Sequence, residues 1–590
     1  MTHDADFYIF RDVRHRTDAA SLAATLRSEL TRLSRCVQLD DLLALLLRAG
    51  ELECALEDAH VPALESTAAS NLTDALAQAA LCCDSSGRPY DGGELRQAAA
   101  QMLAALHSSC NLTIGTPEGF AYYALHPLDY ADLAGRLGLG SAPAVVIGIR
   151  TIGTTLSAVV TAKLQRLGIT AERLTIRPTG HPYRRQSRFT LWQKQVIARA
   201  AANGAMFLVC DEGPGRSGSS LLSVAEALEA LDVPAGRIVI LCSHQPELSA
   251  LCAPDAARRW QRYRSAAAGL TQRLPPDADD YIGGGEWRRI CFSPEASWPA
   301  LWPQMEPLHY LSRDRQATFT FEGHGHYGAP VRARNASLSE SGLGTTYLGH
   351  KSGFGMHALP EVSLAHRTGA TPELLAHMAA YCAWRATEFS AEVARCDALE
   401  LMARTNFERE FNRPLKELEL PVERPAICDN RMSPPYWLST SEGRWLKLDA
   451  AIHGDDHFFP GPCDIAWDLA GLIIEWDLDK AARKQLLALY SRQTSDDVEP
   501  RIRGYEIAYA SFRLAWSKMA MPTVRGGDEE RRLLNDYRRY RRVLQPDAPG
   551  ASGVRCVPSC AEGDDSGETS RPIAASIAPR QPASCEDHLL

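Results

Sequence analysis

The residues best suited to chemistry lie between Ala205 and Leu228, in the stretch AMFLVCDEGPGRSGSSLLSVAEAL. Two adjacent acids, Asp211 and Glu212, follow an apolar run, and a turn rich in glycine and serine comes next. Because such a turn presents backbone N–H groups at the start of a helix, it favours a bound phosphate. The residues that we expect to hold this phosphate are Gly215, Arg216, Ser217, Gly218, Ser219 and Ser220.

The two acids narrow the class of ligand. Carboxylates repel a triphosphate, but they can accept hydrogen bonds from the 2- and 3-hydroxyls of a ribose whose 5-phosphate lies in the turn. We therefore expect Asp211 and Glu212 to hold a ribose ring. The alternative is an ordinary glycine-rich turn between a strand and a helix, with no ligand.

The stretch from Phe207 to Ser220 resembles the signature of type I phosphoribosyltransferases: an apolar strand, two acids, a short Gly/Thr/Ser loop and a helix. It departs from that signature by an extra residue and by Gly213-Pro-Gly215, where the family usually carries an aliphatic residue. The resemblance implies a Mg²⁺-dependent enzyme that transfers the phosphoribosyl group of phosphoribosyl diphosphate to a small, usually nitrogen, nucleophile. It implies that diphosphate is released and that Asp211 and Glu212 are catalytic.

The same resemblance implies a diphosphate-binding turn after the first strand and a mobile basic loop over the site. The turn is predicted at Arg150–Thr154, with Arg150, Thr151 and Gly153 as substrate-binding residues. Cations in the loop would neutralise the charge of a leaving diphosphate. The residues available for that loop are His181, Arg184, Arg185 and Arg188. Their alternative interpretation is a solvated run of charge.

The elements around these residues alternate between strands and helices. Strands are expected at Ala144–Arg150, Leu174–Pro178, Met206–Cys210 and Arg237–Ser243. This alternation predicts an α/β domain with a doubly wound, mostly parallel sheet that binds ligands at the carboxyl ends of its strands. We place this phosphoribosyltransferase-like domain at residues 105–270, after a helical N-terminal extension over 1–104.

An aromatic stretch, Thr116–Gly135, precedes the first strand and carries Glu118, Tyr122, Tyr123 and His126. It could line a binding site, but core packing with satisfied polar tips is the favoured interpretation.

The C-terminal half begins after a linker predicted at 271–300. Ala317–Gly323 and Ala329–Ala336 are expected to be antiparallel strands joined by a glycine hairpin, and Thr371–Phe389 and Asp397–Phe411 to be helices. Asp429 follows a short apolar run, and Asp449 ends a strand.

This layout resembles the aminoglycoside and choline kinase branch of the protein-kinase-like fold, and implies a bilobal α+β domain over 301–545 that could use ATP and Mg²⁺. The resemblance assigns Asp429 as catalytic acid, Asp449 as metal ligand and Asp464 or Asp468 as the helix acid that closes the lobe. Ile427 replaces the usual histidine, and Pro434 replaces the metal-binding asparagine, for which Asn430 is a candidate substitute. The cluster His453-Gly-Asp-Asp-His457 could bind a divalent metal on its own.

The composition and charge of the chain indicate which kinds of partner and which cellular location to expect. The 590 residues carry a net charge of −9, which gives no electrostatic footprint for nucleic acid or an anionic membrane. The N-terminus lacks the pattern of a signal peptide, and no apolar run of membrane-spanning length occurs, so we expect a cytoplasmic protein. The scattered cysteines favour buried free thiols over structural zinc. Residues 546–590 are expected to be disordered.

The leading hypothesis is therefore a phosphoribosyltransferase whose partners are small molecules and whose acceptor is unidentified, with a homo-oligomer left open. The rival is a protein that senses phosphoribosyl diphosphate or a nucleotide without turnover, joined to an inactive kinase-like scaffold. A third hypothesis makes the kinase-like half the principal enzyme.

Overall fold

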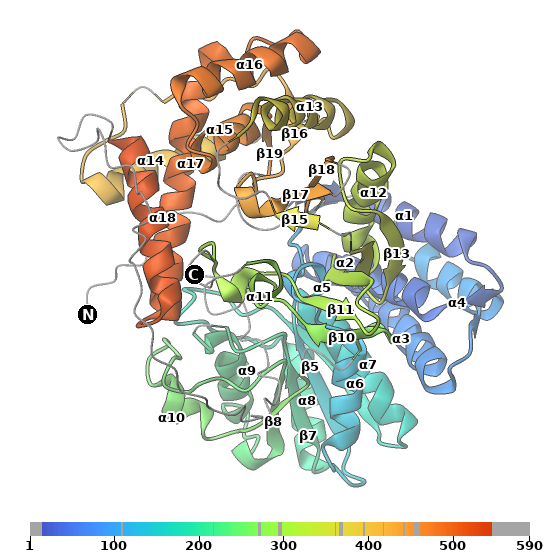
Figure 1. The fold of residues 1–590 in the computed structure, drawn as a ribbon. Coiled ribbons are helices and arrows are strands. Elements are labelled where there is room, and N and C mark those ends of the chain that lie inside the picture. The colour runs from blue at the N-terminus through green and yellow to red at the C-terminus, as the bar shows by residue number, and fades with distance from the viewer. Residues whose placement is uncertain are drawn as a thin grey trace, which may run out of the picture.

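The computed structural model describes residues 15–107, 110–215, 217–269, 273–292, 298–359, 362–364, 370–392, 396–416, 418–440, 443–451 and 461–545. The stretch predicted to be a disordered tail lies outside these ranges. Figure 1 shows a parallel sheet at the base of the molecule, the N-terminal helices beside it and the C-terminal helices above.

The N-terminal region is helical, as predicted. Leucines and alanines at helical spacing bury one side of each helix, and Asp18 caps the first helix by accepting the N–H of Ser21 at 2.8 Å. The helices are α1 (Ala19–Arg32), α2 (Leu39–Asp58), α3 (Ala63–Ser86) and α4 (Gly92–Ala104). Short strand pairs join them: β1 (His15–Asp18) with β4 (Asn111–Ile114), and β2 (Cys36–Val37) with β3 (Tyr90–Asp91).

A five-stranded parallel sheet follows, which confirms the predicted α/β topology of this region. Its strands are β5 (Ala144–Ile149), β6 (Ala171–Ile176), β7 (Met206–Cys210), β8 (Ile238–Cys242) and β9 (Arg264–Ala267). Their spatial order is β6-β5-β7-β8-β9, and every neighbouring pair is parallel. The order is that of a doubly wound sheet, so the connection reverses direction between β5 and β7 and a crevice is expected there.

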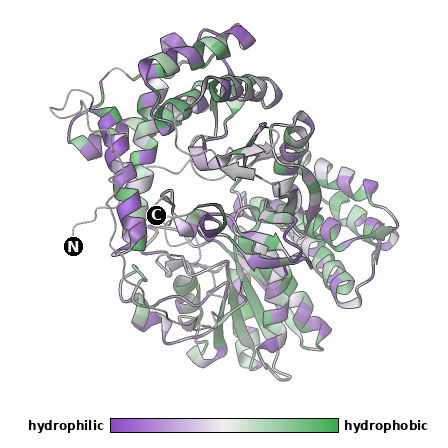
Figure 2. Cartoon of the chain, viewed as in Figure 1, coloured by the Kyte–Doolittle hydropathy of each residue, from purple (hydrophilic) through white to green (hydrophobic). Residues whose placement is uncertain are grey.

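The two faces of this sheet contribute to different cores because alternate residues of a strand point to opposite sides. Val146 and Leu208 face the N-terminal helices, whereas Val145 and Val209 face the opposite layer. Figure 2 shows the strands of this sheet as strongly hydrophobic. The helices around it are α5 (Glu118–Ala121), α6 (Pro127–Arg136), α7 (Ile152–Arg166), α8 (Leu191–Ala202), α9 (Ser219–Glu229) and α10 (Ala256–Trp260). The N-terminal helices and the sheet therefore share one core.

A second sheet, antiparallel, lies between the parallel sheet and the C-terminal helices (Figure 1). Its strands are β10 (Ala278–Tyr281), β11 (His309–Ser312), β12 (Ala317–Phe321), β13 (Tyr347–Lys351) and β14 (Phe354–Ala358), in the order β10-β11-β12-β14-β13. The first of these strands and α11 (Arg288–Cys291) fall within 271–300. The predicted linker therefore contains regular structure, since β10 pairs with β11.

The prediction of a strand at 329–336 was wrong, because these residues belong to helix α12 (Gly325–Ser341). Val331, Arg334, Asn335 and Leu338 are buried at intervals of three and four residues, which is helical spacing. The glycine hairpin predicted before it is the entry to this helix.

The C-terminal part is mainly helical, and both helices predicted there are confirmed. Its helices are α13 (Pro372–Glu388), α14 (Cys396–Phe411), α15 (Ala466–Glu475), α16 (Lys480–Thr494), α17 (Glu499–Ala520) and α18 (Asp528–Leu544). Its strands are β15 (Val362–Leu364), β16 (Pro425–Ile427), β17 (Trp437–Thr440), β18 (Trp445–Lys447) and β19 (Pro462–Asp464). The antiparallel sheet and this helical part form the two lobes that the sequence predicts.

Helix α12 joins the two halves of the chain. The N–H of His324 donates to the carbonyl of Phe120 at 2.9 Å. At Gly325, where φ is +53°, a Cβ would lie 2.8 Å from the Cα of Ala44 in α2. Only glycine allows this approach, so the start of α12 is fitted against both α5 and α2.

A buried carboxylate fastens α18 to the C-terminal part. Arg539 donates to Glu475 at 2.6 Å, and the hydroxyls of Tyr509 and Tyr540 donate to it at 2.9 and 2.8 Å. Burial alone would raise the pKa of Glu475, but Arg539 and Arg513 lower it below 4.5.

We predict that acid releases α18. A carboxyl group whose pKa is lower in the folded protein stabilises the fold at any pH above its ordinary pKa. This stabilisation is lost as the pH falls through the pKa of the folded protein. Hydrogen exchange of residues 528–544 should therefore accelerate below about pH 4. In Glu475→Gln the exchange should be fast already at pH 7, and unchanged protection in that variant would contradict the prediction.

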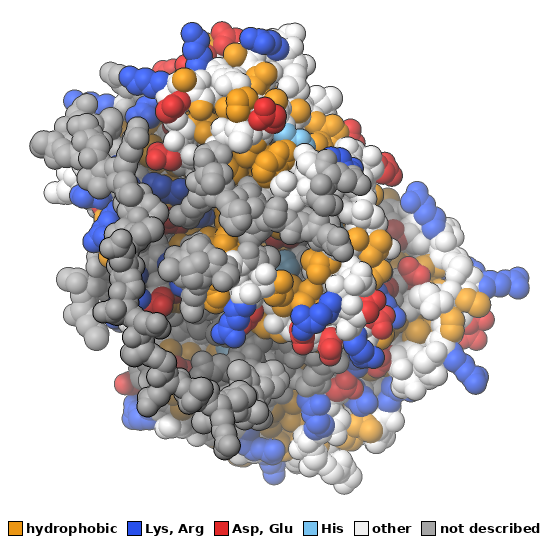
Figure 3. Space-filling model, viewed as in Figure 1, with side chains coloured by type: hydrophobic (Ala, Val, Ile, Leu, Met, Phe, Trp, Pro, Cys, Tyr) orange, Lys and Arg blue, Asp and Glu red, His pale blue; other side chains and the backbone are white. Residues whose placement is uncertain are grey.

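None of the helices that the structure describes is long and apolar enough to cross a membrane. On the described part of the face in Figure 3, acidic and basic side chains are interspersed.

Candidate functional site

The carboxyl ends of β5 and β7 bring the predicted turn and the predicted acids together. Gly148 of β5 is paired with Cys210 of β7. A Cβ on Gly153 would overlap the carbonyl of Cys210, so the turn after β5 lies directly on the end of β7. Arg150, Thr151 and Gly153 therefore border the strand end that carries Asp211 and Glu212.

Thr151 has a strained backbone in this turn, with φ +101° and ψ −94°. A β-branched residue rarely adopts positive φ, and such strain is concentrated at functional sites. Arg177 holds the conformation, since it donates to the carbonyl of Arg150 at 2.8 Å and to the Thr151 hydroxyl at 3.0 Å. Arg177 was not among the predicted site residues, although its position at the end of a predicted strand indicates that it could lie at the ligand-binding edge of the sheet.

The two acids have different surroundings. Burial raises the pKa of Asp211 to about 7, and the positive charge of Arg177 acts in the opposite direction. Glu212 is buried, and its carboxylate accepts the N–H of Gly119 at 3.1 Å. The hydroxyl of Tyr130 donates to the carbonyls of both residues, at 2.6 and 2.9 Å, and so fixes the strand end.

The glycine–serine turn has the geometry of a helix entry. Gly215 and Gly218 have φ of +52° and +65°, and α9 begins at Ser219. Ser219 and Ser220 therefore lie in its first turn, where backbone N–H groups are free of helical partners and attract an anion. Arg216 lies outside the described residues.

The predicted basic loop lies over this turn. The hydroxyl of Ser217 donates to the carbonyl of Pro182 at 3.0 Å, and that of Ser219 donates to the same oxygen. Arg185 donates to the carbonyl of Gly180 at 2.8 Å, whereas Arg184 is exposed. The loop and the turn are thus in contact, and whether the loop covers a ligand stays a prediction.

Arg150 is engaged by acids that the sequence analysis did not single out. Its guanidinium pairs with Glu57 and with Asp58 at the end of α2, each at 2.9 Å. Asp58 also pairs with Arg177. A diphosphate that used Arg150 would have to displace these carboxylates.

Asp211 and Glu212 together offer two carboxylates at one strand end. This donor set suits Mg²⁺, which is commonly held by one or two carboxylates together with substrate phosphates and water. No group of three or more His, Cys, Asp and Glu side chains in the described parts of the chain could hold a metal ion.

A matched pair of variants tests how Gly119 positions Glu212. A Cβ at Gly119 would overlap the Glu212 carboxylate, so Gly119→Ala should displace that side chain and weaken binding of phosphoribosyl diphosphate about tenfold. Gly236→Ala is the control, because a Cβ there meets nothing within 4 Å. Calorimetric titration with phosphoribosyl diphosphate measures the affinity of both variants. Equal affinities would show that the position of Glu212 does not affect binding of this ligand.

In the kinase-like half, the structure places Asp429 in the interior and not in a cleft. It is 0% exposed. Tyr381 donates to it at 2.5 Å, Lys447 pairs with it at 3.0 Å, and Arg385 lies 3.9 Å away. The catalytic role that the resemblance assigns to Asp429 stays a prediction, and in the structure these three side chains hold its carboxylate.

Asp468, at the start of α15, is buried. Its carboxylate accepts the N–H groups of Asp429 and Asn430 at 2.8 and 3.0 Å, and so holds the segment that follows β16. Asp464 accepts the N–H groups of Glu423 and Arg424 instead. Asn430 is not placed as a metal ligand, because its side-chain oxygen accepts the indole N–H of Trp467 at 3.0 Å.

A cleft of about 160 Å³ separates the two lobes. Asp449, the predicted metal ligand, lines it together with Glu306 and Lys447. Thr318 and Thr320 face it from β12, and the only lysine among its described lining residues is Lys447, which pairs with Asp429. Protein kinases place their ATP-binding lysine on the third strand, so that group is missing here.

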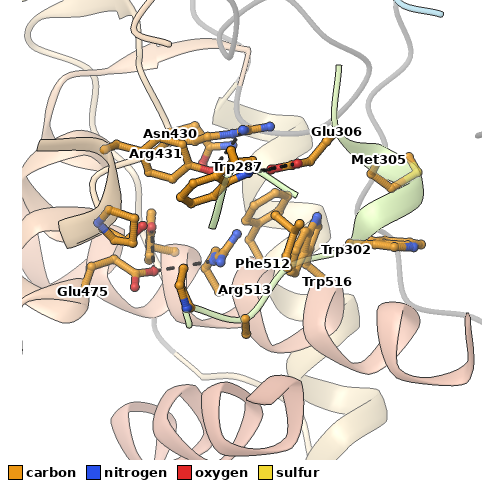
Figure 4. Close-up of a pocket in the computed structure, with 17 residues that line it drawn as sticks. Trp287, Trp302, Met305, Glu306, Asn430, Arg431, Glu475, Phe512, Arg513 and Trp516 are labelled. Atoms are coloured by element: carbon orange, nitrogen blue, oxygen red, sulfur yellow. Dashed lines mark hydrogen bonds and ion pairs between the residues drawn. The ribbon is translucent and has the colours of Figure 1, made fainter. Parts of the chain in front are cut away.

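Arg431, two residues after Asp429, is not among the described residues that line this cleft. It lines an adjoining pocket of about 70 Å³ (Figure 4) and donates to the hydroxyl of Tyr436 at 3.0 Å. Glu306 lies in the same pocket and accepts the N–H of Gly285 at 2.9 Å and the indole N–H of Trp287 at 3.2 Å. His453 and its neighbours lie outside the described residues.

No family model matches this sequence, and no curated protein matches it. Solved structures similar to part of the chain include a choline kinase from Streptococcus pneumoniae, with 17% identity, 41% of this chain and 89% of that chain covered, and a TM-score of 0.28. An ethanolamine kinase from Plasmodium vivax has 9% identity, covers 40% and 78%, and has a TM-score of 0.26. An aminoglycoside phosphotransferase from Alicyclobacillus acidocaldarius has 11% identity, covers 46% and 92%, and has a TM-score of 0.25. Similarity at these TM-scores carries no argument about activity.

Proposed function

We propose that the chain binds phosphoribosyl diphosphate at the carboxyl ends of β5 and β7 and transfers its phosphoribosyl group to a small nitrogen nucleophile. The observation that carries the proposal is the strained turn at Thr151, which lies against the strand end that bears Asp211 and Glu212. A strained turn, a pair of acids and a glycine–serine helix entry at one sheet edge suit a sugar that carries a phosphate at each end.

The chemistry follows from the groups at this edge. The carboxylates of Asp211 and Glu212 would accept hydrogen bonds from the ribose hydroxyls, and the backbone N–H groups at the start of α9 would hold the 5-phosphate. The bond between C1 and the diphosphate oxygen breaks, and its electron pair leaves with diphosphate. The nucleophile nitrogen bonds to C1 and releases its proton to solvent or to a base. Mg²⁺, when bound, neutralises the diphosphate charge.

The second candidate is a protein that binds phosphoribosyl diphosphate without turnover. It keeps the binding groups of the strand end but does not use Arg150 to stabilise a leaving diphosphate, since Arg150 is already paired with Glu57 and Asp58. In either case we propose that the kinase-like half transfers no phosphate, since Asp429 is fully buried and paired with Lys447.

The test is release of diphosphate from phosphoribosyl diphosphate by the full chain, with Mg²⁺ and a panel of nucleobases and amines. Release with one acceptor class supports the transferase. Calorimetric binding without release supports the sensor, and the absence of both would overturn the proposal. ATP consumption by the full chain that is lost in Asp449→Asn would instead establish the kinase-like half as an enzyme.

A further inference from the structure

Two acids at the end of α2 occupy the cations that border the proposed phosphoribosyl site. Asp58 lies between two guanidinium groups, since it pairs with Arg150 at 2.9 Å and its two carboxylate oxygens lie 3.3 and 3.2 Å from Nε of Arg177. Glu57 pairs with the other terminal nitrogen of Arg150, also at 2.9 Å. The N-terminal extension, for which no site residue was predicted, therefore supplies two carboxylates to the turn after β5.

The position of these acids on α2 is electrostatically unfavourable by itself. Glu57 and Asp58 are the last two residues of the helix, and its last turn carries no basic residue. The C-terminal end of a helix bears a partial negative charge, so carboxylates there are destabilising. The positive charges of Arg150 and Arg177 offset this effect and hold both acids in place.

These ion pairs are open enough to solvent for a dissolved anion to replace the acids. The side chains of Glu57 and Asp58 are 28% and 32% exposed. Another ion pair of the same helix, Glu53 with Arg173, is only 2% and 3% exposed, and its separation would leave a buried charge without a partner. Separation of the outer pairs leaves each acid in contact with water.

The space at this turn is too small for a diphosphate while the acids are in place. Asp58, Thr151 and Arg177 line a cavity of about 30 Å³, well below the ~300 Å³ at which small-molecule sites begin. The positive charge of Arg177 also acts on Asp211, so this cavity lies next to the strand end. A ligand group that reaches Arg177 at this turn must therefore displace the carboxylate of Asp58.

A guanidinium recognises carboxylates and phosphates in the same way. Both anions accept a pair of parallel N–H hydrogen bonds, and both are bound more strongly than a neutral acceptor. A diphosphate carries several negative charges within a short span, so it can replace both carboxylates at once. The two acids thus match the chemistry of the group that would bind here.

We propose that Glu57 and Asp58 are an internal competitor for the diphosphate group of the substrate. They hold Arg150 and Arg177 in the free protein and release them when a diphosphate binds. This inference rests on the proposed function, which places the diphosphate at the turn after β5. The N-terminal extension then lowers the affinity for the substrate, and binding frees the last turn of α2.

The test is calorimetric titration of the full chain with phosphoribosyl diphosphate and with inorganic diphosphate, each with Mg²⁺ present. Glu57→Gln and Asp58→Asn should each bind both ligands about fivefold more tightly than the unmodified chain, because each variant removes one near-surface ion pair that competes with the ligand. Glu172→Gln is the matched control. It removes an exposed acid of β6 that pairs with Arg199 at 2.9 Å, and it should leave both affinities unchanged.

A purely structural role of the acids gives a different result. If the ion pairs only fasten α2 to the sheet, or if the acids hold the Mg²⁺ of the ligand, the variants bind diphosphate with equal or lower affinity, and the inference is overturned. Hydrogen exchange gives an independent readout. In the unmodified chain, inorganic diphosphate should accelerate exchange of residues 55–61, because the acids at the helix end are released. Slower or unchanged exchange there would contradict the inference.

The inference and the proposed function fail in different ways. Equal binding of phosphoribosyl diphosphate by the unmodified chain and both variants keeps the phosphoribosyl site and overturns the role of the two acids. Tighter binding of inorganic diphosphate by the variants, without binding of phosphoribosyl diphosphate, supports the role of the acids and counts against the proposed function alone. Absence of binding of either ligand to any of these proteins overturns both.

Discussion

Replacing Asp429 by alanine is expected to lower the free energy of unfolding of the C-terminal half by about 3–5 kcal/mol. A loss of this size is typical when one partner of a buried ion pair is removed. Lys447 and Arg385 would be left as buried cations, and the hydroxyl of Tyr381 would lose its acceptor. Burial already lowers the pKa of Lys447, and Asp429 opposes that effect. Urea titration followed by tryptophan fluorescence measures the loss.

Two controls test this explanation. Glu408→Ala removes an exposed carboxylate of α14 and should change stability by less than about 0.5 kcal/mol. Asp429→Leu combined with Lys447→Met removes both charges and should recover part of the loss, because an apolar pair can replace a buried ion pair. A stable Asp429→Ala protein that has lost a phosphotransfer activity would instead support the catalytic role that the sequence suggested.

Replacing Glu212 by glutamine, or Asp211 by asparagine, is expected to reduce diphosphate release by about 10²–10³-fold if the strand end holds the ribose hydroxyls. Both substitutions keep the shape of the side chain and remove a charge that accepts hydrogen bonds. Asp232→Asn, an exposed change in the same half of the chain, should leave the rate unchanged. Full activity in both acid variants would show that neither Asp211 nor Glu212 takes part in the reaction.

The pH dependence offers a second measurement on the same acids. Because the pKa of Asp211 is raised to about 7, its carboxyl is mainly protonated at pH 6 and mainly ionised at pH 8. The ionised form is the better acceptor of hydroxyl hydrogen bonds, so the rate should rise with pH through neutrality. In Asp211→Asn this rise should disappear, whereas a profile that keeps its shape would assign the titration to another group.

Local sequence was sufficient for four of the five strands of the parallel sheet, whereas β9 (Arg264–Ala267) was not predicted. The runs at Ala144–Ile149 and Met206–Cys210 are apolar throughout because both faces of each strand are covered, and that pattern is visible without a structure. The grouping of Arg150, Thr151 and Gly153 with Asp211 and Glu212 followed from the same topology. The helix at 325–341 was missed, because its glycines and Pro330 are typical of a loop and its buried spacing begins only at Val331.

Charge and burial between distant segments depend on the folded chain. The α/β alternation, the pair of acids and the glycine–serine turn can be read from the sequence, because each is a property of neighbouring residues. It could not show that Lys447 and Arg385 surround Asp429, that Glu57 and Asp58 engage Arg150, or that α5 and α12 enclose a cavity. These contacts join residues far apart in the chain, and their energies depend on desolvation, which exists only once the chain has folded.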